Sequence, residues 1–343
     1  MRLNFILFTA LLAFLVVSCT GNKSLENVNA VVLTSEFIYE NAPFPECHAS
    51  TIVETGNGLL AAWFGGTEEK DKDVCIYVSE NKNNRWSIPE LVADGIINDT
   101  LRYPCWNPVL FKKNNGDIVL YYKVGPSPRE WWGLYKISTD NGKTWSEAVE
   151  IPDNLLGPIK NKPEHLSDGA ILYPTSFETS KKWTVYVEKS DDNLKNWEKV
   201  EIDNNGFNAI QPTILFYDDN KIQMLCRSKE HKVVETWSDD NGTTWTPMQA
   251  TSLVNNNSGI DGVTTDSKLQ LLVCNPIEKG RHKISVLASY DGKNWKNLVD
   301  LEDQKKGTEF SYPAIIEAGD GTIYITYTYN RKTIKFIHLK INE

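Results

Sequence analysis

The chain has 343 residues, of which 41% are hydrophobic, 24% charged and 11% aromatic, and its formal net charge is −9. This composition is that of an ordinary globular protein and excludes a disordered, collagen-like or multi-span membrane protein. The acidic balance, with no cluster of Lys and Arg, also excludes a nucleic-acid partner, since phosphate binding requires a basic face. Eleven Trp and fourteen Tyr are a first positive indication, because such rings pack between sheets or stack on sugars.

The N-terminal residues read as a targeting segment. The apolar stretch from Phe5 to Val17 is too short for a spanning helix and has the size of a signal-peptide core. It leads into Val-Val-Ser-Cys ending at Cys19, which resembles the bacterial lipobox, where the Cys is lipidated and becomes the mature N-terminus. We therefore expect a signal peptide at 1–18 and a lipidated Cys19 with a short tether at 19–27. A simple signal peptide with a chance Cys is the alternative.

An envelope lipoprotein follows from this reading. The folded domain, residues 28–343, would be held at the bacterial cell envelope, facing the periplasm or the outer surface, and would contact the membrane only through its lipid anchor.

An internal repeat dominates the remaining sequence. The octapeptide Ser-Thr-Asp-Asn-Gly-Lys-Thr-Trp at 138–145 recurs at 238–245 as Ser-Asp-Asp-Asn-Gly-Thr-Thr-Trp, and weaker copies end at Trp86, Trp197 and Trp295. Successive Trp positions are separated by 59, 52, 48 and 50 residues. In phase with them, turn pairs flanked by apolar runs occur at Asn57-Gly58, Asn115-Gly116, Asp168-Gly169, Asp219-Asn220, Asp266-Ser267 and Asp320-Gly321. Each such pair indicates a β-hairpin.

The repeat unit predicts a propeller blade. Each unit reads strand, tight turn, strand, strand, octapeptide turn, strand, and four strands at this period are typical of a β-propeller. The last hairpin has no octapeptide turn after it, so we expect the segment from Val28 to Ile38 to supply its outer strand and close the ring. The prediction is an all-β, monomeric protein with a single six-bladed β-propeller of four-stranded antiparallel blades. Asp140 and Asp240, in the octapeptide turns, are expected to be structural.

Five Cys remain after the N-terminal segment, at wide spacing and without a Cys/His ligand pattern. We expect buried free thiols, no metal site and no cofactor.

These turns, known as Asp-boxes, on six blades resemble the sialidase (neuraminidase) superfamily, and in particular its bacterial Asp-box-repeat, or BNR-repeat, sialidase-like glycosidases. The resemblance extends to four further segments: Pro45–Thr51, Trp63–Thr67, Gly157–Pro163 and Tyr312–Ile316. It implies an active site at one mouth of the central channel, where the innermost strands of all blades begin.

The resemblance also implies roles for individual residues. Sialidases hold the sugar carboxylate with three Arg and use a Tyr nucleophile with a Glu partner and an Asp acid. By position, Tyr312 resembles the nucleophile and Arg281 one carboxylate-binding Arg. Asp73 resembles the acid, and three neighbouring loop acids compete with it: Glu68, Glu69 and Asp71.

Two positions depart from the family pattern. His48 stands where the first-blade Arg is expected, and Gln211 stands where the Glu partner is expected. No Arg matches the second carboxylate ligand, so sialic acid is a doubtful substrate. Glu235 is either a substitute base or a partner in a salt bridge, and His48 is an acid/base, a donor to a substrate carboxylate or a structural histidine.

Further residues are candidates for substrate contact. Cationic contacts to an acidic sugar are expected from Lys160, Lys162 and Arg227. Stacking walls are expected from Trp106, Trp131 and Trp132, the last two being adjacent in a turn-rich stretch.

The functional hypothesis is an exo-acting glycoside hydrolase that removes a terminal sugar from an acidic oligosaccharide or polysaccharide. The alternatives are a uronate-directed polysaccharide lyase or rhamnosidase-type propeller, with His48 or Tyr312 as the catalytic group, and a non-catalytic carbohydrate-binding propeller. The register of the innermost strands decides which side chains reach the channel, because a slip of one residue exchanges channel and packing positions.

Overall fold

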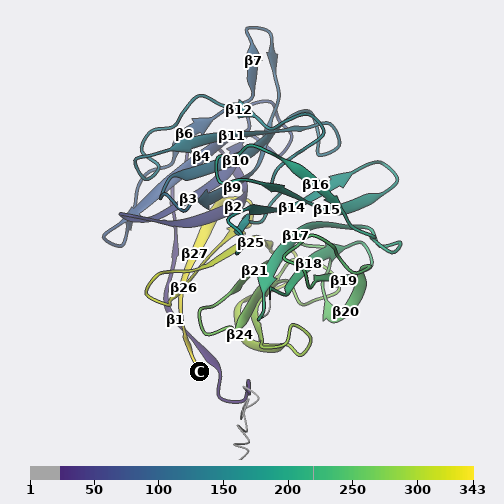
Figure 1. The fold of residues 1–343 in the computed structure, drawn as a ribbon. Coiled ribbons are helices and arrows are strands. Elements are labelled where there is room, and N and C mark those ends of the chain that lie inside the picture. Colours follow the sequence, from purple (N-terminus) through teal and green to yellow (C-terminus); the bar gives the residue numbers. More distant parts are fainter. Residues whose placement is uncertain (1–23, 219) are drawn as a thin grey trace, which may run out of the picture.

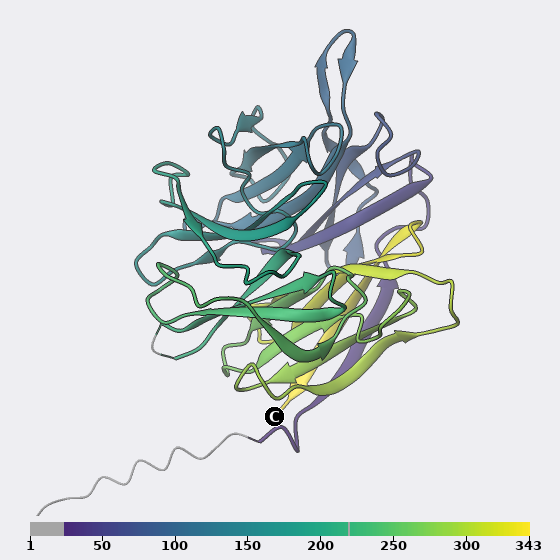
Figure 2. The ribbon, with the colours of Figure 1, turned by 90° about the vertical axis from the view of Figure 1, so that its right-hand side faces the viewer.

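The computed structural model describes residues 24–218 and 220–343, so the predicted signal peptide and Cys19 lie outside the described residues. The described chain forms six four-stranded antiparallel sheets and one additional hairpin. The sheets are arranged around a common centre, as Figures 1 and 2 show. The predicted all-β, six-bladed propeller with four-stranded blades is therefore confirmed.

The strands follow the predicted repeat, with the innermost strand of each blade first in the following bounds. Blade 1 contains β2 (Glu46–Thr55), β3 (Gly58–Gly66), β4 (Cys75–Lys82) and an outer strand split into β5 (Arg85–Trp86) and β6 (Glu90–Ala93). Blade 2 contains β9 (Cys105–Lys112), β10 (Ile118–Val124), β11 (Trp132–Ser138) and β12 (Val149–Glu150). Blade 3 contains β13 (Glu164–His165), β14 (Ile171–Glu178), β15 (Trp183–Ser190) and β16 (Glu198–Glu201).

The second half of the ring repeats this order. Blade 4 contains β17 (Ala209–Phe216), β18 (Ile222–Ser228), β19 (Lys232–Ser238) and β20 (Gln249–Val254). Blade 5 contains β21 (Asp261–Thr264), β22 (Gln270–Cys274), β23 (Lys283–Ser289) and β24 (Lys296–Asp303). Blade 6 contains β25 (Phe310–Glu317), β26 (Ile323–Tyr329), β27 (Thr333–Asn342) and β1 (Asn29–Phe37).

The ring is closed by the N-terminal strand, as predicted. Strand β1 pairs antiparallel with β27, from Asn29 opposite Asn342 to Phe37 opposite Lys335. The two ends of the chain thus complete one blade, and the outer edge of β27 is paired. The hairpin of β7 (Ile96–Asn98) and β8 (Leu101–Arg102) was not predicted; it projects from the connection between blades 1 and 2 (Figure 1).

Apolar clusters fill the seams between neighbouring blades. Between blades 6 and 1, for example, the fully buried Trp63 packs with Ile334 and Phe336. The inner strands read as nearly continuous apolar runs because both of their faces are covered by adjacent blades. The five Cys of the described chain are buried and free, as expected.

The octapeptide turns have a structural role. Asp140 accepts hydrogen bonds from Ser138 Oγ at 2.8 Å, Thr144 N at 2.9 Å and Thr144 Oγ1 at 2.6 Å. The turn joins the third and fourth strands, so it lies at the end of the blade opposite the start of the innermost strand. These carboxylates shape turns far from the mouth of the channel.

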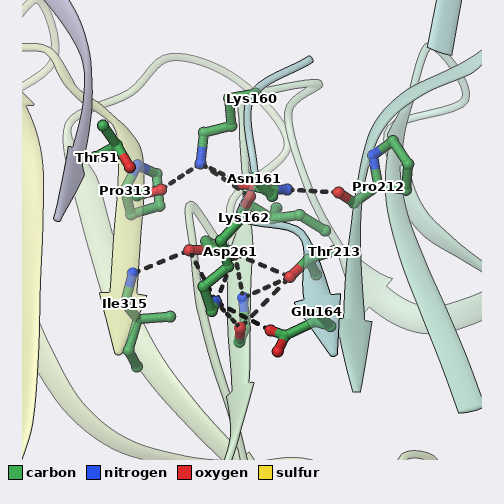
Figure 3. Close-up of polar contacts among 12 residues, drawn as sticks. Thr51, Lys160, Asn161, Lys162, Glu164, Pro212, Thr213, Asp261, Pro313 and Ile315 are labelled. Carbon is green, nitrogen blue, oxygen red and sulfur yellow. Dashed lines mark hydrogen bonds and ion pairs between the residues drawn. The ribbon is translucent and has the colours of Figure 1, made fainter. Parts of the chain in front are cut away.

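The centre of the ring is tied together by one buried carboxylate. Asp261, at the start of β21, accepts hydrogen bonds from Thr213 Oγ1 at 2.9 Å and from Ile315 N at 3.0 Å. Lys162 Nζ lies 3.4 Å from Asp261 Oδ1, and Glu164 is farther from the same ammonium at 3.9 Å. Figure 3 shows these contacts, which connect blades 3, 4, 5 and 6.

We predict that Asp261→Asn destabilises the protein by about 3–5 kcal/mol, because it leaves the mostly buried Lys162 ammonium without its nearest carboxylate. The measurement is the free energy of unfolding from urea denaturation. Lys199→Met, which removes an exposed ion pair with Glu201, is the control and should cost about 0–1 kcal/mol. Equal losses in the two variants would show that the central contact does not tie the blades together.

Candidate functional site

Four innermost strands begin with the same distortion at the mouth of the channel. Ala49, Asn107, Gln211 and Tyr312 have positive φ angles of 58°, 36°, 53° and 53°. At each of these positions, in blades 1, 2, 4 and 6, the register of pairing between the innermost strand and the second strand shifts. A left-handed backbone is unfavourable for residues other than glycine, and such bulges redirect side chains. The distortion therefore marks the mouth as the place where the fold stores strain.

Tyr312 is the centre of the polar contacts at this mouth. It is half-buried, and its Oη accepts hydrogen bonds from Gln211 Nε2 at 3.3 Å and Arg227 Nη1 at 3.1 Å. Arg227 Nη1 also donates to Gln211 Oε1 at 3.1 Å, which turns the amide so that its nitrogen faces Tyr312. Two donors aimed at one phenol oxygen stabilise negative charge that develops there.

Two arginines lie close to this tyrosine, and a third is joined to one of them through a shared carboxylate. The guanidinium carbons of Arg227 and Arg281 lie 5.8 Å and 5.9 Å from the centroid of its ring. Arg281 Nη1 is 2.8 Å from Glu309 Oε1, and Arg331 Nε is 3.0 Å from the same oxygen. Arg331 also pairs with Glu69. Arg281 and Arg331 are thus neutralised by carboxylates of the protein.

Arg227 differs from these two arginines. Its side chain is 6% exposed, and its hydrogen-bond partners within the described chain are neutral: Asn257 Oδ1 at 2.9 Å, Gln211 and Tyr312. A buried guanidinium without a carboxylate partner favours binding of an anion. Arg227, predicted only as one of several cationic contacts, therefore touches the central residue of the site.

Sequence reasoning missed Arg331 and Glu309. Arg331 lies in the turn between β26 and β27, and Glu309 directly precedes β25. The sequence did contain a signal for both residues. Each is a charged residue next to the end of an apolar strand that lies at the mouth, and Arg227 occupies the corresponding position on β18.

His48 packs against the tyrosine ring. The two ring centroids are 4.1 Å apart, and His48 Nδ1 lies 3.0 Å from Thr328 Oγ1. Burial, and next the charges of Arg331, Arg281 and Arg227, lower the pKa of His48 well below its ordinary value. The imidazole is therefore neutral at neutral pH, which argues against a general acid and favours a role in positioning the Tyr312 ring.

The acidic loop between β3 and β4 places its carboxylates differently. Asp73 is exposed, and its carboxylate accepts hydrogen bonds from Thr67 N at 3.0 Å and Thr67 Oγ1 at 2.8 Å, which closes the loop. Glu69 reaches Arg331. The structure thus brings Glu69 into contact with the arginines, whereas Asp73 remains an exposed carboxylate on the same loop.

Lys160 and Lys162 are occupied by protein groups and are not available for sugar contacts, contrary to the prediction. Lys160 Nζ donates to Asn161 Oδ1 at 2.8 Å, Ile260 O at 3.1 Å and Pro313 O (Figure 3). Burial lowers the pKa of Lys160 to about 7, while these three acceptors use all three protons of the ammonium form. Its Nζ lies 6.0 Å from the centroid of the Tyr312 ring. The charge is fixed beneath the site because the segment 157–163 enters the channel.

Glu235 does not reach the site. It lies on β19, the third strand of its blade, and its Oε2 accepts hydrogen bonds from Gln223 Nε2 at 2.5 Å and Trp237 Nε1 at 3.0 Å. It is not placed to act as the predicted base for Tyr312, because its strand is separated from the channel by two others. Within the described residues it does not form the alternative salt bridge either.

The predicted stacking walls are largely buried. Trp106 is 2% exposed and Trp131 8% exposed, and they form a core cluster with Leu156 and Ile159. Trp106 offers no free ring face, since its Nε1 also donates to Gly125 O at 2.9 Å. Trp132 is half-buried and meets Tyr103 edge to face at 5.8 Å.

A second aromatic neighbour of the site was not predicted. Trp183, at the start of β15, has the Arg227 guanidinium 5.9 Å and the Lys229 ammonium 4.2 Å from its ring centroid. Glu178 pairs with Trp183 across the same hairpin, and burial raises the pKa of its carboxyl despite the charge of Arg227.

The described residues contain neither a metal-ligand cluster nor a membrane-spanning helix. Within 24–218 and 220–343, no group of three or more His, Cys, Asp or Glu side chains is arranged to hold a metal ion. The same residues contain no helix with the length and hydropathy needed to cross a membrane.

Comparison with known proteins identifies one matching protein family and several similar propeller structures. Residues 57–325 match the model of a protein family described as BNR repeat-like domain. No curated protein sequence matches the chain. Among solved structures, a protein of unknown function from Dyadobacter fermentans is similar, with a TM-score of 0.76 and 16% identity over 92% of this chain and 100% of that one.

Solved structures of a sialidase and of a trans-sialidase are also similar. The K499G mutant of the NanB sialidase from Streptococcus pneumoniae gives a TM-score of 0.72 at 11% identity, over 89% of this chain and 70% of that one. The intramolecular trans-sialidase from Ruminococcus gnavus gives 0.69 at 12% identity, over 90% of this chain and 97% of that one. At such identities the likeness shows a shared sialidase-like fold.

We predict that His48 is mostly neutral at pH 6.5, where an ordinary imidazole is half-protonated, because an imidazolium would be buried beside several cations. Long-range ¹H–¹⁵N NMR spectra recorded from pH 8 to pH 5 report its protonation state. Arg331→Met should raise the pKa of His48, since it removes the cation with the largest effect on that group. Half-protonation of His48 at or above pH 6.5 would contradict the neutral state.

Proposed function

The chain belongs to the BNR repeat-like domain family, and we propose that it is an exo-acting glycoside hydrolase that removes a terminal acidic sugar from glycans. The observation that carries this proposal is the buried Arg227 guanidinium, which has no carboxylate partner among the described residues and donates a hydrogen bond to Tyr312. A substrate carboxylate would supply the missing charge.

The arginines would orient the sugar. Arg227 and Arg281 lie at nearly equal distances from the centroid of the Tyr312 ring, and their planar guanidinium groups match a carboxylate in geometry. In a sialic acid the anomeric carbon carries the carboxylate, so binding the carboxylate there would bring that carbon toward Tyr312 Oη. A uronic acid, whose carboxylate is on C5 across the ring oxygen from the anomeric carbon, would also bind to these arginines.

We propose that Tyr312 stabilises positive charge at the anomeric carbon. Gln211 cannot take the phenol proton, so direct attack by the phenol would have no proton acceptor in this position. In the proposed reaction the glycosidic C–O bond breaks, and a carboxyl group of the loop between β3 and β4, Asp73 by its position, gives its proton to the leaving oxygen. Water then adds to the anomeric carbon, and its proton returns to Asp73.

One observation favours a second candidate, a non-catalytic carbohydrate-binding propeller. Gln211 occupies the place of the expected Glu and is held by both Arg227 and Tyr312, so the site is fully hydrogen-bonded without a base. A binding protein needs the arginines and the tyrosine but no proton transfer.

We predict that the purified protein releases a terminal sugar from a panel of sialosides and uronosides, measured by anion-exchange chromatography. Tyr312→Phe and Arg227→Met should each lower the rate by about 100-fold, since each removes a group placed at the developing charge or at the carboxylate. Tyr103→Phe, outside the site, is the control and should leave the rate unchanged.

The other outcomes of this assay discriminate between the candidates. Recovery of a bound oligosaccharide intact would support the binding propeller. An absorbance from unsaturated products would support the uronate lyase instead, because elimination leaves a double bond in the sugar. Full activity in Tyr312→Phe would contradict the role of the phenol oxygen.

We also propose that the protein is an envelope lipoprotein anchored through Cys19, a residue outside the described chain. The sequence Val-Val-Ser-Cys supports this proposal. We predict that Cys19→Ser moves the protein from the membrane fraction to the soluble fraction, measured by immunoblot after fractionation. An unchanged distribution would argue against lipidation, and Cys47→Ser, a buried thiol, is the control.

A further inference from the structure

A groove of about 500 Å³ lies between blades 2 and 3 on the mouth side of the ring. Its walls carry aromatic rings from Trp131, Trp132, Phe177 and Tyr186 and polar side chains from Glu150, Asp153, Asn154, Thr184 and Lys199. Phe177 is 41% exposed, which is unusual for a ring of this size on a strand. The volume and the mixed lining are those of a small-molecule or oligosaccharide site.

The groove adjoins the candidate site across one hairpin. Side chains alternate between the two faces of a strand, so Phe177 and Thr184 face the groove while Glu178 and Trp183 face the other way. On that other side, Trp183 lies 5.9 Å from the Arg227 guanidinium. The β14–β15 hairpin is therefore a common wall of the groove and of the arginine site.

A row of ring contacts connects the same two places below the surface. The ring centroids of His48 and Phe64 are 5.7 Å apart, those of Phe64 and Trp106 6.4 Å, and those of Trp106 and Trp131 5.9 Å. Since His48 packs on Tyr312 and Trp131 lines the groove, the two surfaces rest on one packed layer. Their relative position is fixed by this packing.

The charges of the groove suit neutral sugars. Its cation, Lys199, lies 3.9 Å from the centroid of the Tyr186 ring and is paired with Glu201 at 2.8 Å. The remaining charged side chains of the lining, Glu150 and Asp153, are acidic. A carboxylate-bearing sugar would be repelled here and attracted by Arg227.

We propose that this groove binds the neutral pyranose residues that follow the terminal acidic sugar of the substrate. Aromatic rings would contact the apolar faces of the pyranoses. Asn154 and Thr184 would donate hydrogen bonds to the hydroxyl groups or accept them, and the acidic side chains would accept them. The inference rests on the proposed function for its orientation, because the acidic end of the glycan is assigned to Arg227. It makes the protein selective for oligosaccharides over simple glycosides of the same acid.

Binding of lacto-N-tetraose, a neutral tetrasaccharide, tests the groove without any need for catalysis. Titration calorimetry on the full protein should show that Phe177→Ala and Trp132→Ala each weaken binding by about tenfold. Phe37→Ala is a matched control, because Phe37 is 40% exposed but lies in blade 6, and it should bind like the wild type.

The acidic counterpart of the probe, the same tetrasaccharide with a terminal sialic acid, separates the two proposals. If Phe177→Ala weakens binding of the neutral probe while no sugar is released from the acidic one, the groove stands and the proposed hydrolase fails. If the acidic probe is hydrolysed but Phe177→Ala and Phe37→Ala bind the neutral probe equally, the groove proposal fails alone. Absence of any binding of lacto-N-tetraose to the wild type overturns it as well.

Discussion

The contacts at the propeller axis are the constraint on which the functional surface depends. Asp261 accepts a hydrogen bond from Ile315 N, and Lys160 Nζ donates one to Pro313 O. The strand that carries Tyr312 is therefore held by two separate segments of the chain. Both contacts come from chain segments outside blade 6. A buried ion and its hydrogen bonds must be satisfied together, since leaving one group unpaired costs more than the whole arrangement contributes. The position of Tyr312 is thereby fixed by the assembly of the ring and not by its own blade.

The electrostatics of the mouth follow from how its charges are paired. Arg281 and Arg331 share Glu309, whereas Arg227 has neutral partners and Lys160 is saturated by oxygen atoms of the chain. His48 remains neutral because burial and these cations oppose its protonation. Among the described residues Arg227 is thus a buried guanidinium of the site without a carboxylate partner, and its charge selects for anionic ligands.

Different blades carry the charged and the aromatic binding surfaces. Blades 4, 5 and 6 carry the arginines, and blades 2 and 3 carry the aromatic groove, with the β14–β15 hairpin between them. Such a division is easily built on a propeller, because each blade contributes its own loops at the mouth while the seams stay apolar. A terminal charged sugar and the neutral sugars behind it would meet chemically different surfaces on one rigid support.

The sequence by itself determined the architecture, because the repeat of turn pairs and octapeptides is local and each copy specifies its own hairpin. It also identified Val28–Ile38 as the closing strand and brought Tyr312, Gln211, Arg281 and His48 to one mouth, since each stands near the mouth end of an innermost or neighbouring strand. Only the tertiary structure decided which side chains face the channel. The strand bulges shift the register, so the face on which a side chain lies cannot be deduced by counting residues from the turns. Arg331, Glu309 and Trp183 come from elements whose spatial neighbours are far away in the sequence. Lys160, Lys162, Glu235 and Trp106 were misassigned for the same reason, because burial and partners are properties of the assembled ring.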